Sequence, residues 1–339
     1  MSATAPALLT DLLREVSRSF YITLRVLPGP VRPQIGVAYL LARATDTVAD
    51  SEAVPVEDRL RSLEELRDRI VGGREVAVDF SHIPEDAATV GERALLRRIE
   101  EAVSLLNGFS CFDRCCIRQV LDTIVSGQAK DLERFHAANG TRLTALQTSD
   151  ELDDYTFRVA GCVGEFWTRL CRQHLYPKAK LEVGQYCRDA VRFGKGLQRV
   201  NILRDLPVDL RKGRCYVPVD GLNRHALRPA DLLDPVNEIR FRALYREHLE
   251  VAAEELKAGW RYTCATPREQ FRVRLACALP LLIGAETLRL LAVGNVLDGK
   301  RRIKVPRNRV KHLLLQATLW HPFRRRWEAL FDATLPAAR

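Results

Sequence analysis

The stretch FGKGLQRVNILRDLPVD at residues 193–209 spaces its apolar side chains three and four residues apart, which is typical of a helix. Gln198, Asn201 and Asp205 recur at the same spacing, so a polar stripe runs along one face. Asp209 follows Asp205 by four residues and extends that stripe. Because such a stripe is costly to bury without a ligand or a metal ion, the stretch predicts a helix that lines a site.

A second cluster of the same form, DTVAD, lies at residues 46–50. Its carboxylates, Asp46 and Asp50, are also four residues apart, and an arginine shortly precedes each cluster, Arg43 here and Arg204 in the other. Two such helix faces opposing each other would hold divalent cations and leave coordination positions open for a phosphorylated substrate. One cluster alone is more often a solvated helix face, whereas the pair predicts diphosphate chemistry.

Helical spacing extends over most of the 339 residues, and alternating patterns typical of strands are short and rare. We therefore predict an all-α chain that forms one domain, 1–339. The clearest helical windows are 37–48, 59–70, 91–106, 113–132, 150–170, 181–204, 239–261 and 271–291. The segment 211–238 contains three prolines and directly follows the second acidic cluster, so we expect an irregular loop there that can cover a site.

The net charge of +10 is compatible with three kinds of partner: nucleic acid, an anionic membrane surface, or an anionic small molecule. The acidic clusters would repel a phosphate backbone, and no DNA-recognition motif is found. A basic helical nucleic-acid-binding protein is therefore the remote alternative, and we expect no nucleic acid.

Cysteine usage and hydropathy indicate a cytoplasmic protein. The nine cysteines are odd in number and lack a repeated CxxC pair, which favours reduced thiols over disulfides or zinc. No signal-peptide pattern is found. The longest apolar stretch, 275–296, is interrupted by Glu286 and Arg289, so we do not expect it to span a membrane.

Together these motifs resemble those of the head-to-head isoprenyl diphosphate synthases, that is, the squalene, dehydrosqualene and phytoene synthases. The landmarks are SRSF at 17–20, DTVAD at 46–50, VAGCVG at 159–164, and GKGLQRVNILRD at 194–205 with GRCYVP at 213–218. The resemblance covers nearly the whole chain and is closest to a bacterial squalene synthase. It implies an isoprenoid synthase fold, a single helical domain with a central cavity lined by acidic helices.

In that family carboxylates bind magnesium, which holds the diphosphates of two prenyl donors. The resemblance assigns Mg²⁺, with Mn²⁺ as a substitute, to Asp46, Asp50, Asp205 and Asp209. It assigns the substrate, two farnesyl diphosphates, to Ser17, Arg18, Ser19, Phe20, Tyr39, Arg43, Gln128, Gln198, Asn201, Arg204 and Arg214. Asp131 resembles a further acidic position of the family, with Gln128 beside it, although a solvated helix face explains Asp131 equally well. Ionising an allylic carbon–oxygen bond yields a carbocation and diphosphate, so the leaving group needs metal and arginine.

The carbocation needs a dry wall with aromatic faces, for which the candidates are Tyr39, Tyr155, Phe157 and Phe166. Tyr155 is the predicted catalytic residue that takes up the proton or steadies the first cation. Phe157 and Arg158 stand where other members carry tyrosine. Pro207 predicts a kinked or ending helix before Asp209, which makes Asp205 the safer ligand.

The basic stretch 300–309 resembles the segment that binds the reductant in squalene synthases. It predicts an NADPH site at Lys300, Arg302, Lys304 and Arg307, and hence squalene as the product. Dehydrosqualene or phytoene synthesis without NADPH, or a reaction that stops at presqualene diphosphate, is the alternative. The C-terminal segment, about 300–339, is basic and includes aromatic residues, so we expect peripheral contact with an anionic membrane or else a packing helix, and no obligate protein partner.

Overall fold

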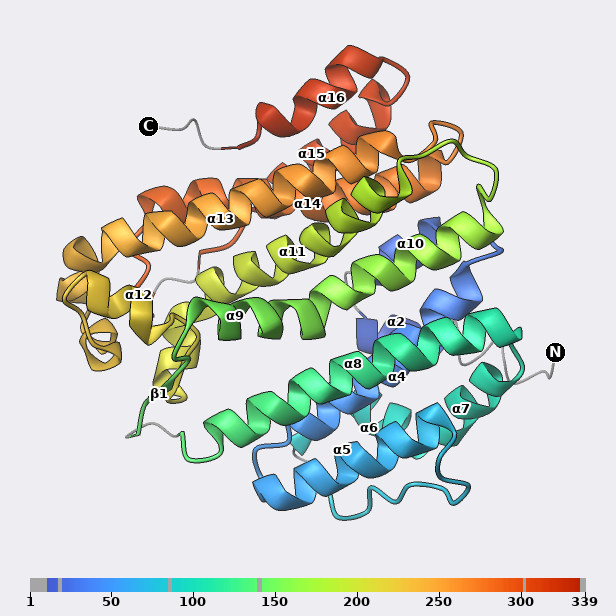
Figure 1. The fold of residues 1–339 in the computed structure, drawn as a ribbon, viewed down its shortest axis with the longest axis horizontal. Coiled ribbons are helices and arrows are strands. Elements are labelled where there is room, and N and C mark those ends of the chain that lie inside the picture. Colours follow the sequence, from blue (N-terminus) through green and yellow to red (C-terminus); the bar gives the residue numbers. More distant parts are fainter. Residues whose placement is uncertain (1–10, 18–19, 85–86, 139–141, 301–302, 336–339) are drawn as a thin grey trace. The chain divides into compact units, whose positions relative to one another are not determined.

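A computed structural model describes residues 11–17, 20–84, 87–138, 142–300 and 303–335. Its contacts divide the chain into two compact units, Met1–His136 with Phe166–Ala179, which we call the first unit, and Ala137–Glu165 with Lys180–Arg339, which we call the second unit. Almost all of the described residues in regular structure are helical, so the all-α prediction is confirmed (Figure 1). The expectation of one domain stays a prediction.

The first unit is a helical bundle in which α4 packs against α5, α6, α7 and α8. Its helices are α2 Leu13–Ser17, α3 Phe20–Val26, α4 Arg32–Ala49, α5 Val56–Val71, α6 Val90–Arg97, α7 Ile99–Asn107 and α8 Cys111–Phe135. α10, Cys162–His174, begins in the second unit and ends in the first. One apolar side of α4, including Leu40, Leu41 and Ala44, is fully buried, so its polar residues fall on the remaining face.

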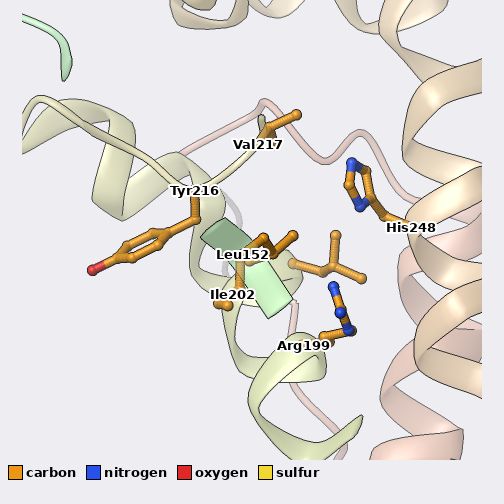
Figure 2. Close-up of a pocket in the computed structure, with 7 residues that line it drawn as sticks. Leu152, Arg199, Ile202, Tyr216, Val217 and His248 are labelled. Atoms are coloured by element: carbon orange, nitrogen blue, oxygen red, sulfur yellow. The ribbon is translucent and has the colours of Figure 1, made fainter. Parts of the chain in front are cut away.

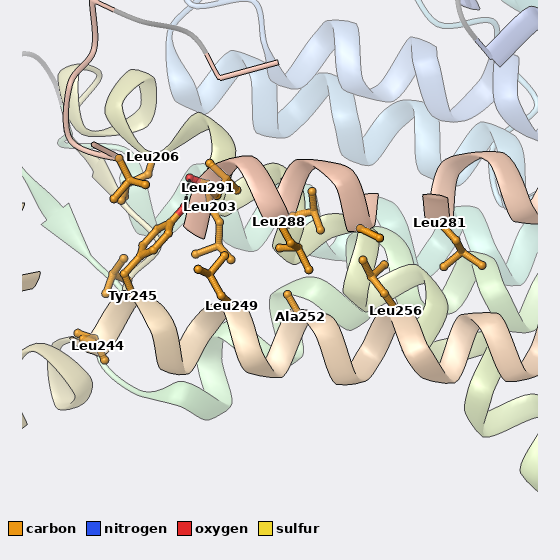
Figure 3. Close-up of a cluster of buried hydrophobic side chains, with 14 of the residues drawn as sticks. Leu203, Leu206, Leu244, Tyr245, Leu249, Ala252, Leu256, Leu281, Leu288 and Leu291 are labelled. Atoms are coloured by element: carbon orange, nitrogen blue, oxygen red, sulfur yellow. Dashed lines mark hydrogen bonds between the residues drawn. The ribbon is translucent and has the colours of Figure 1, made fainter. Parts of the chain in front are cut away.

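The second unit is built around α11, Val183–Arg211, which packs against α13, Glu238–Ala265, and α14, Phe271–Val293. Its other helices are α9 Ser149–Thr156, a π-helical turn Phe157–Gly161, α12 Val219–Arg224, short 3-10 helices Pro229–Leu233 and Pro235–Asn237, α15 Arg307–Trp320 and α16 Arg324–Asp332. Two short strands, β1 Thr144–Ala145 and β2 Arg214–Cys215, pair in parallel with Thr144 opposite Arg214. Buried leucines from α11, α13 and α14 form the core (Figure 3).

Glycines allow α11 to approach the chain that precedes it. A β-carbon on Gly164 would lie 1.9 Å from the carbonyl oxygen of Ala190, and one on Gly194 would lie 2.1 Å from that of Ala160. Both distances are far below van der Waals contact, so only glycine fits. Two of the sequence landmarks, VAGCVG and GKG, are thus the two sides of one close helix contact.

By length and composition, α14 is long and apolar enough to cross a membrane. However, 61% of its most apolar 18-residue stretch is buried inside the protein. Its residues Ala278, Leu281, Leu282 and Ala285 are fully buried in the core of the second unit. These contacts indicate a core helix.

Candidate active-site residues

The first acidic cluster lies at the C-terminal end of α4, where Asp50 is the C-cap residue. Tyr39, Arg43, Asp46 and Asp50 follow one another at helical spacing, and the Arg43 guanidinium lies 3.9 Å from the Asp46 carboxylate. From α8, the Gln128 amide Nε2 donates a hydrogen bond of 2.5 Å to Asp46 Oδ1. Five of these positions were predicted from the sequence, and the first unit brings them together.

Glu92 joins this cluster and was missed by the sequence analysis. Arg43 donates a hydrogen bond to Glu92 Oε1. Glu92 is itself held in place, because it forms a capping box with Thr89 at the start of α6. Burial alone would raise the pKa of Glu92, but its hydrogen bonds to Thr89 and Arg43 outweigh burial and lower it. The T-x-x-E spacing at 89–92 signals the cap, but no local pattern signals its contact with Arg43.

The electrostatics of Asp46 favour a cation. Burial of the carboxyl group, followed by repulsion from Asp50, raises its pKa to about 6, against the opposing effects of Arg43 and Gln128. The side chain still keeps 47% of its surface exposed, so a ligand can reach the carboxyl group from solvent. Binding of a cation would therefore stabilise the ionised carboxylates of Asp46 and Asp50.

The second acidic cluster lies in the last turns of α11. Arg204 Nε and Nη2 donate to the two oxygens of Asp205, at 3.0 and 2.5 Å. Asn201 is exposed, and its Nδ2 lies 3.5 Å from Gln198 Oε1. The polar stripe predicted along this helix therefore exists.

The sequence predicted that the helix is kinked or ends at Pro207. It does not end there, so that part is wrong, while the kink stays a prediction. α11 continues to Arg211 and carries Asp205 and Asp209 on one helix, four residues apart. Pro207 has no N–H to donate to the carbonyl of Leu203, four residues earlier. The hydroxyl of Tyr245 on α13 donates to that carbonyl instead, at 3.1 Å.

Tyr155 lies in the last turn of α9, two residues before the start of the π-helical turn Phe157–Gly161. Its ring stacks on that of Tyr216, with centroids 4.9 Å apart. Arg158, at a position where tyrosine was expected from the family, pairs with Asp154 at 2.9 Å. π-helical turns are frequent at functional sites, which is compatible with a catalytic role for Tyr155.

Of the other three aromatic candidates, Phe157 begins the π-helical turn in the second unit, and Tyr39 and Phe166 lie in the first unit. Phe166 is buried, and the Tyr39 hydroxyl donates to the carbonyl of Val16 at 3.4 Å. Burial raises the pKa of Tyr39 despite the nearby Arg43. Tyr39 therefore stays a neutral aromatic side chain beside the acidic cluster.

An ion-pair network that the sequence analysis missed connects α9, α11 and α13. Arg199 bridges Asp153, at 3.0 Å, and Glu255, at 2.9 Å, and Lys195 pairs with Asp153 as well. Arg199 also lines a small pocket with Tyr216 and His248, together with apolar side chains (Figure 2). The network fixes α9, and hence Tyr155, against the helix that carries the second acidic cluster.

Several predicted substrate residues are only partly described. Ser17 is buried and donates to the carbonyl of Leu13. Arg18, Ser19 and the side chain of Phe20 lie outside the described residues. Arg214 is half-buried in β2.

In the basic segment, Lys300, Lys304 and Arg307 are exposed, and Arg302 lies outside the described residues. Arg309 donates to Glu286, a buried carboxylate on α14, at 3.0 and 3.1 Å. This ion pair anchors the end of the basic segment to the core of the second unit.

Comparison with known proteins places this arrangement in a family. The model of the squalene/phytoene synthase family matches residues 13–309. The bifunctional lycopene cyclase/phytoene synthase of Blakeslea trispora is 31% identical over 221 residues, which make up 63% of this chain and 33% of that protein. The squalene synthase ERG9 of Saccharomyces cerevisiae is 26% identical over 238 residues, 70% of this chain and 51% of that protein. The chain thus spans about a third to a half of the length of these relatives.

Among solved structures, the complex of TcSQS with the ligand E5700 has a TM-score of 0.76 at 21% identity, covering 99% of this chain and 93% of that one. The likeness confirms the isoprenoid synthase fold that the sequence motifs implied. Because the family model also matches most of the chain, including both acidic clusters, the chain belongs to the squalene/phytoene synthase family.

Proposed function

We propose that this chain is a squalene synthase, which condenses two farnesyl diphosphates to presqualene diphosphate and reduces that intermediate to squalene with NADPH. Family membership makes it a head-to-head prenyltransferase. The observation that carries the proposal is the pair of dicarboxylate helix faces, Asp46 with Asp50 and Asp205 with Asp209, each beside an arginine.

The donor set fits magnesium. Among the described residues, no three or more His, Cys, Asp or Glu side chains come together as a metal cage. Mg²⁺ prefers one or two carboxylates with water and substrate phosphates, which is what each cluster offers. The Oε1 atom of Gln128 is buried and accepts no hydrogen bond from the described residues, so beside Asp46 it leaves an acceptor for a ligand that donates a hydrogen bond. The bound cation would neutralise the diphosphate charge that develops as the allylic carbon–oxygen bond breaks.

In the first half-reaction, the arginines and Tyr155 have different proposed roles. Arg43 and Arg204 are already oriented by carboxylates and present guanidinium groups for the leaving diphosphate. The allylic cation alkylates the double bond of the second farnesyl diphosphate, and loss of one proton closes a cyclopropane ring. Tyr155, held by its stack on Tyr216, is the proposed group that takes up this proton or steadies the cation.

In the second half-reaction the cyclopropyl diphosphate ionises, rearranges and accepts a hydride, which leaves NADP⁺. The exposed cations Lys300, Lys304 and Arg307, with Arg302, are the proposed contacts to the 2′-phosphate of NADPH. Arg309 contributes indirectly by anchoring their segment to Glu286.

The test is incubation of the purified protein with farnesyl diphosphate and Mg²⁺, with and without NADPH, followed by mass analysis of the products. Squalene formed only with NADPH is the expected result. Dehydrosqualene, or presqualene alcohol after phosphatase treatment, formed regardless of NADPH would overturn the reductive step. No turnover with farnesyl diphosphate, but turnover with geranylgeranyl diphosphate, would support the phytoene synthase alternative, which the Blakeslea trispora relative favours.

Asp46→Asn and Asp205→Asn test the role of the acidic clusters. Each should lower kcat by at least about a hundredfold, because each removes a carboxylate that would hold the Mg²⁺, and that cation would neutralise the leaving diphosphate. Each should also weaken the thermal stabilisation produced by Mg²⁺ with inorganic diphosphate. Asp58→Asn is the matched control, because Asp58 on α5 pairs with its exposed neighbour Arg61 and belongs to neither acidic cluster.

A further inference from the structure

Pro207 creates a local defect in α11. In a regular helix the N–H of residue 207 would donate to the carbonyl of Leu203, and proline cannot supply that bond. Leu203 is 4% exposed, so water does not readily reach its carbonyl. A buried carbonyl left without a donor is costly, which would weaken the helix in the turn that carries Asp205 and Asp209.

Tyr245 repairs this defect from another helix. Its side chain is fully buried and extends from α13 towards α11, where the hydroxyl donates to the Leu203 carbonyl at 3.1 Å (Figure 3). Burial raises the pKa of the hydroxyl far above its ordinary value, so it stays protonated as a donor. The hydroxyl therefore keeps the proton that it donates at neutral pH.

The Leu203 carbonyl, which accepts the hydrogen bond from Tyr245, lies close to the second acidic cluster. Leu203 directly precedes Arg204 and Asp205, and the defect lies one turn before the helix ends at Arg211. Leu206 and Leu210 fix the apolar side of this turn in the core. The Tyr245 hydroxyl adds a hydrogen bond from α13 to this turn, at the carbonyl that the proline leaves without its helical donor.

We propose that Tyr245 is a positioning residue for the second acidic cluster: its hydroxyl replaces the helix hydrogen bond lost at Pro207 and holds Asp205 and Asp209 in the orientation that binds the cation and diphosphate. This inference rests on the proposed function for its ligand. It does not depend on the product or on NADPH.

A double-mutant cycle between Tyr245→Phe and Pro207→Ala tests the proposal. Alanine at 207 restores the N–H, so it should make the tyrosine hydroxyl redundant. In Tyr245→Phe we expect faster amide exchange in residues 204–211, and a Mg²⁺ concentration for half-maximal stabilisation by inorganic diphosphate that rises about three- to tenfold, in line with the loss of one hydrogen bond. Adding Pro207→Ala should restore both quantities.

Tyr186→Phe is the matched control. Tyr186 is also buried, lies near the beginning of α11, and shares a 2.8 Å hydrogen bond with Thr266. It should lower stability without changing exchange in 204–211 or the Mg²⁺ requirement. If Tyr245→Phe behaves like Tyr186→Phe, or if Pro207→Ala fails to rescue it, the proposal is overturned.

The exchange measurement needs no ligand, so it separates this proposal from the proposed function. A wild-type protein that Mg²⁺ and diphosphate do not stabilise would count against the metal chemistry. Rescue of amide exchange by Pro207→Ala would in that case still support Tyr245 as the residue that holds this turn. Absence of rescue would overturn the positioning role whatever the ligand.

Discussion

Arg43 shows how a single side chain is prepared for an anion. It lies between Asp46 on its own helix and Glu92 on α6, and its Nε atom is buried with no hydrogen-bond acceptor among the described residues. A guanidinium group held by carboxylates loses little side-chain entropy when a diphosphate arrives. Under the proposed function, Glu92 would act on the diphosphate of the substrate through Arg43.

Glu92→Gln is expected to raise KM for farnesyl diphosphate about tenfold, because the charge-assisted hydrogen bond to Arg43 is weakened. Glutamine can still form the capping box, so the stability of α6 should change little. Thr89→Ala provides the converse control: it should cost about 1 kcal/mol of stability and leave KM unchanged. Steady-state kinetics with urea unfolding measure both quantities, and an unchanged KM in Glu92→Gln would show that Arg43 is oriented without it.

His248 makes stability depend on pH. Burial, with the nearby Arg199, lowers its pKa to about 4, from an ordinary value near 6.5, and its Nε2 is buried without a partner among the described residues. The unfolded chain therefore binds a proton between pH 6.5 and 4 that the folded chain rejects, so stability falls as pH falls through this window. The full loss is at most about 3 kcal/mol.

Unfolding midpoints in urea from pH 7 to 4.5 should accordingly decrease for the wild type and decrease less for His248→Gln. Part of the slope should remain, because burial also lowers the pKa of His321 to about 4. Identical slopes for the two proteins would mean that His248 is protonated in the folded state.

At the scale of elements, the sequence predicted helices well where apolar spacing was continuous. The windows 37–48, 59–70 and 239–261 all lie within single helices of the structure. The window 91–106 instead divides into α6 and α7 at Arg98, where the backbone leaves helical geometry. Such breaks depend on packing and carry no local signal.

In the candidate site too, residues set by local spacing could be predicted, whereas contacts between distant parts of the chain could not. Paired carboxylates on one helix, such as Asp46 with Asp50, are a property of local spacing and could be predicted. Glu92 and Tyr245 could not, because each contacts its partner across a long sequence separation. The continuation of the helix past Pro207 could not be predicted for the same reason, since the donor that compensates for the proline comes from another helix.

Gly194→Ala should be strongly destabilising, by about 3 kcal/mol or more, because its β-carbon would collide with the backbone at Ala160. Gly184→Ala is the matched control in the same helix. Its β-carbon would meet only the flexible end of Arg188, at 3.3 Å, so stability should be unchanged or rise by up to about 1 kcal/mol. Urea unfolding of both variants tests this helix contact, and equal stabilities would show that α11 can shift to accommodate the methyl group.

At the scale of the whole molecule, exposed basic residues gather near exposed apolar side chains on α15 and at the start of α16. Leu315 and Leu319 on α15 and Phe323 after it are 55–57% exposed at four-residue spacing. The exposed basic residues near them are Lys311, Arg324, Arg325 and Arg326. Apolar side chains flanked by cations complement the headgroup region of an anionic bilayer, so we propose that this α15–α16 face binds such a membrane peripherally.

The α15–α16 face should make the protein sediment with vesicles that contain phosphatidylglycerol, more weakly as salt is raised, and not with vesicles of phosphatidylcholine alone. Leu315→Ser with Leu319→Ser should reduce the bound fraction severalfold, because less apolar surface enters the bilayer. Val236→Ser with Ile239→Ser is the matched control, since these side chains are 72% and 84% exposed but lie beside Glu238. Equal losses of the bound fraction for the two pairs would indicate nonspecific adhesion. Loss for the leucine pair alone would mean that the protein binds the membrane through this face. An oily product could then leave without crossing water.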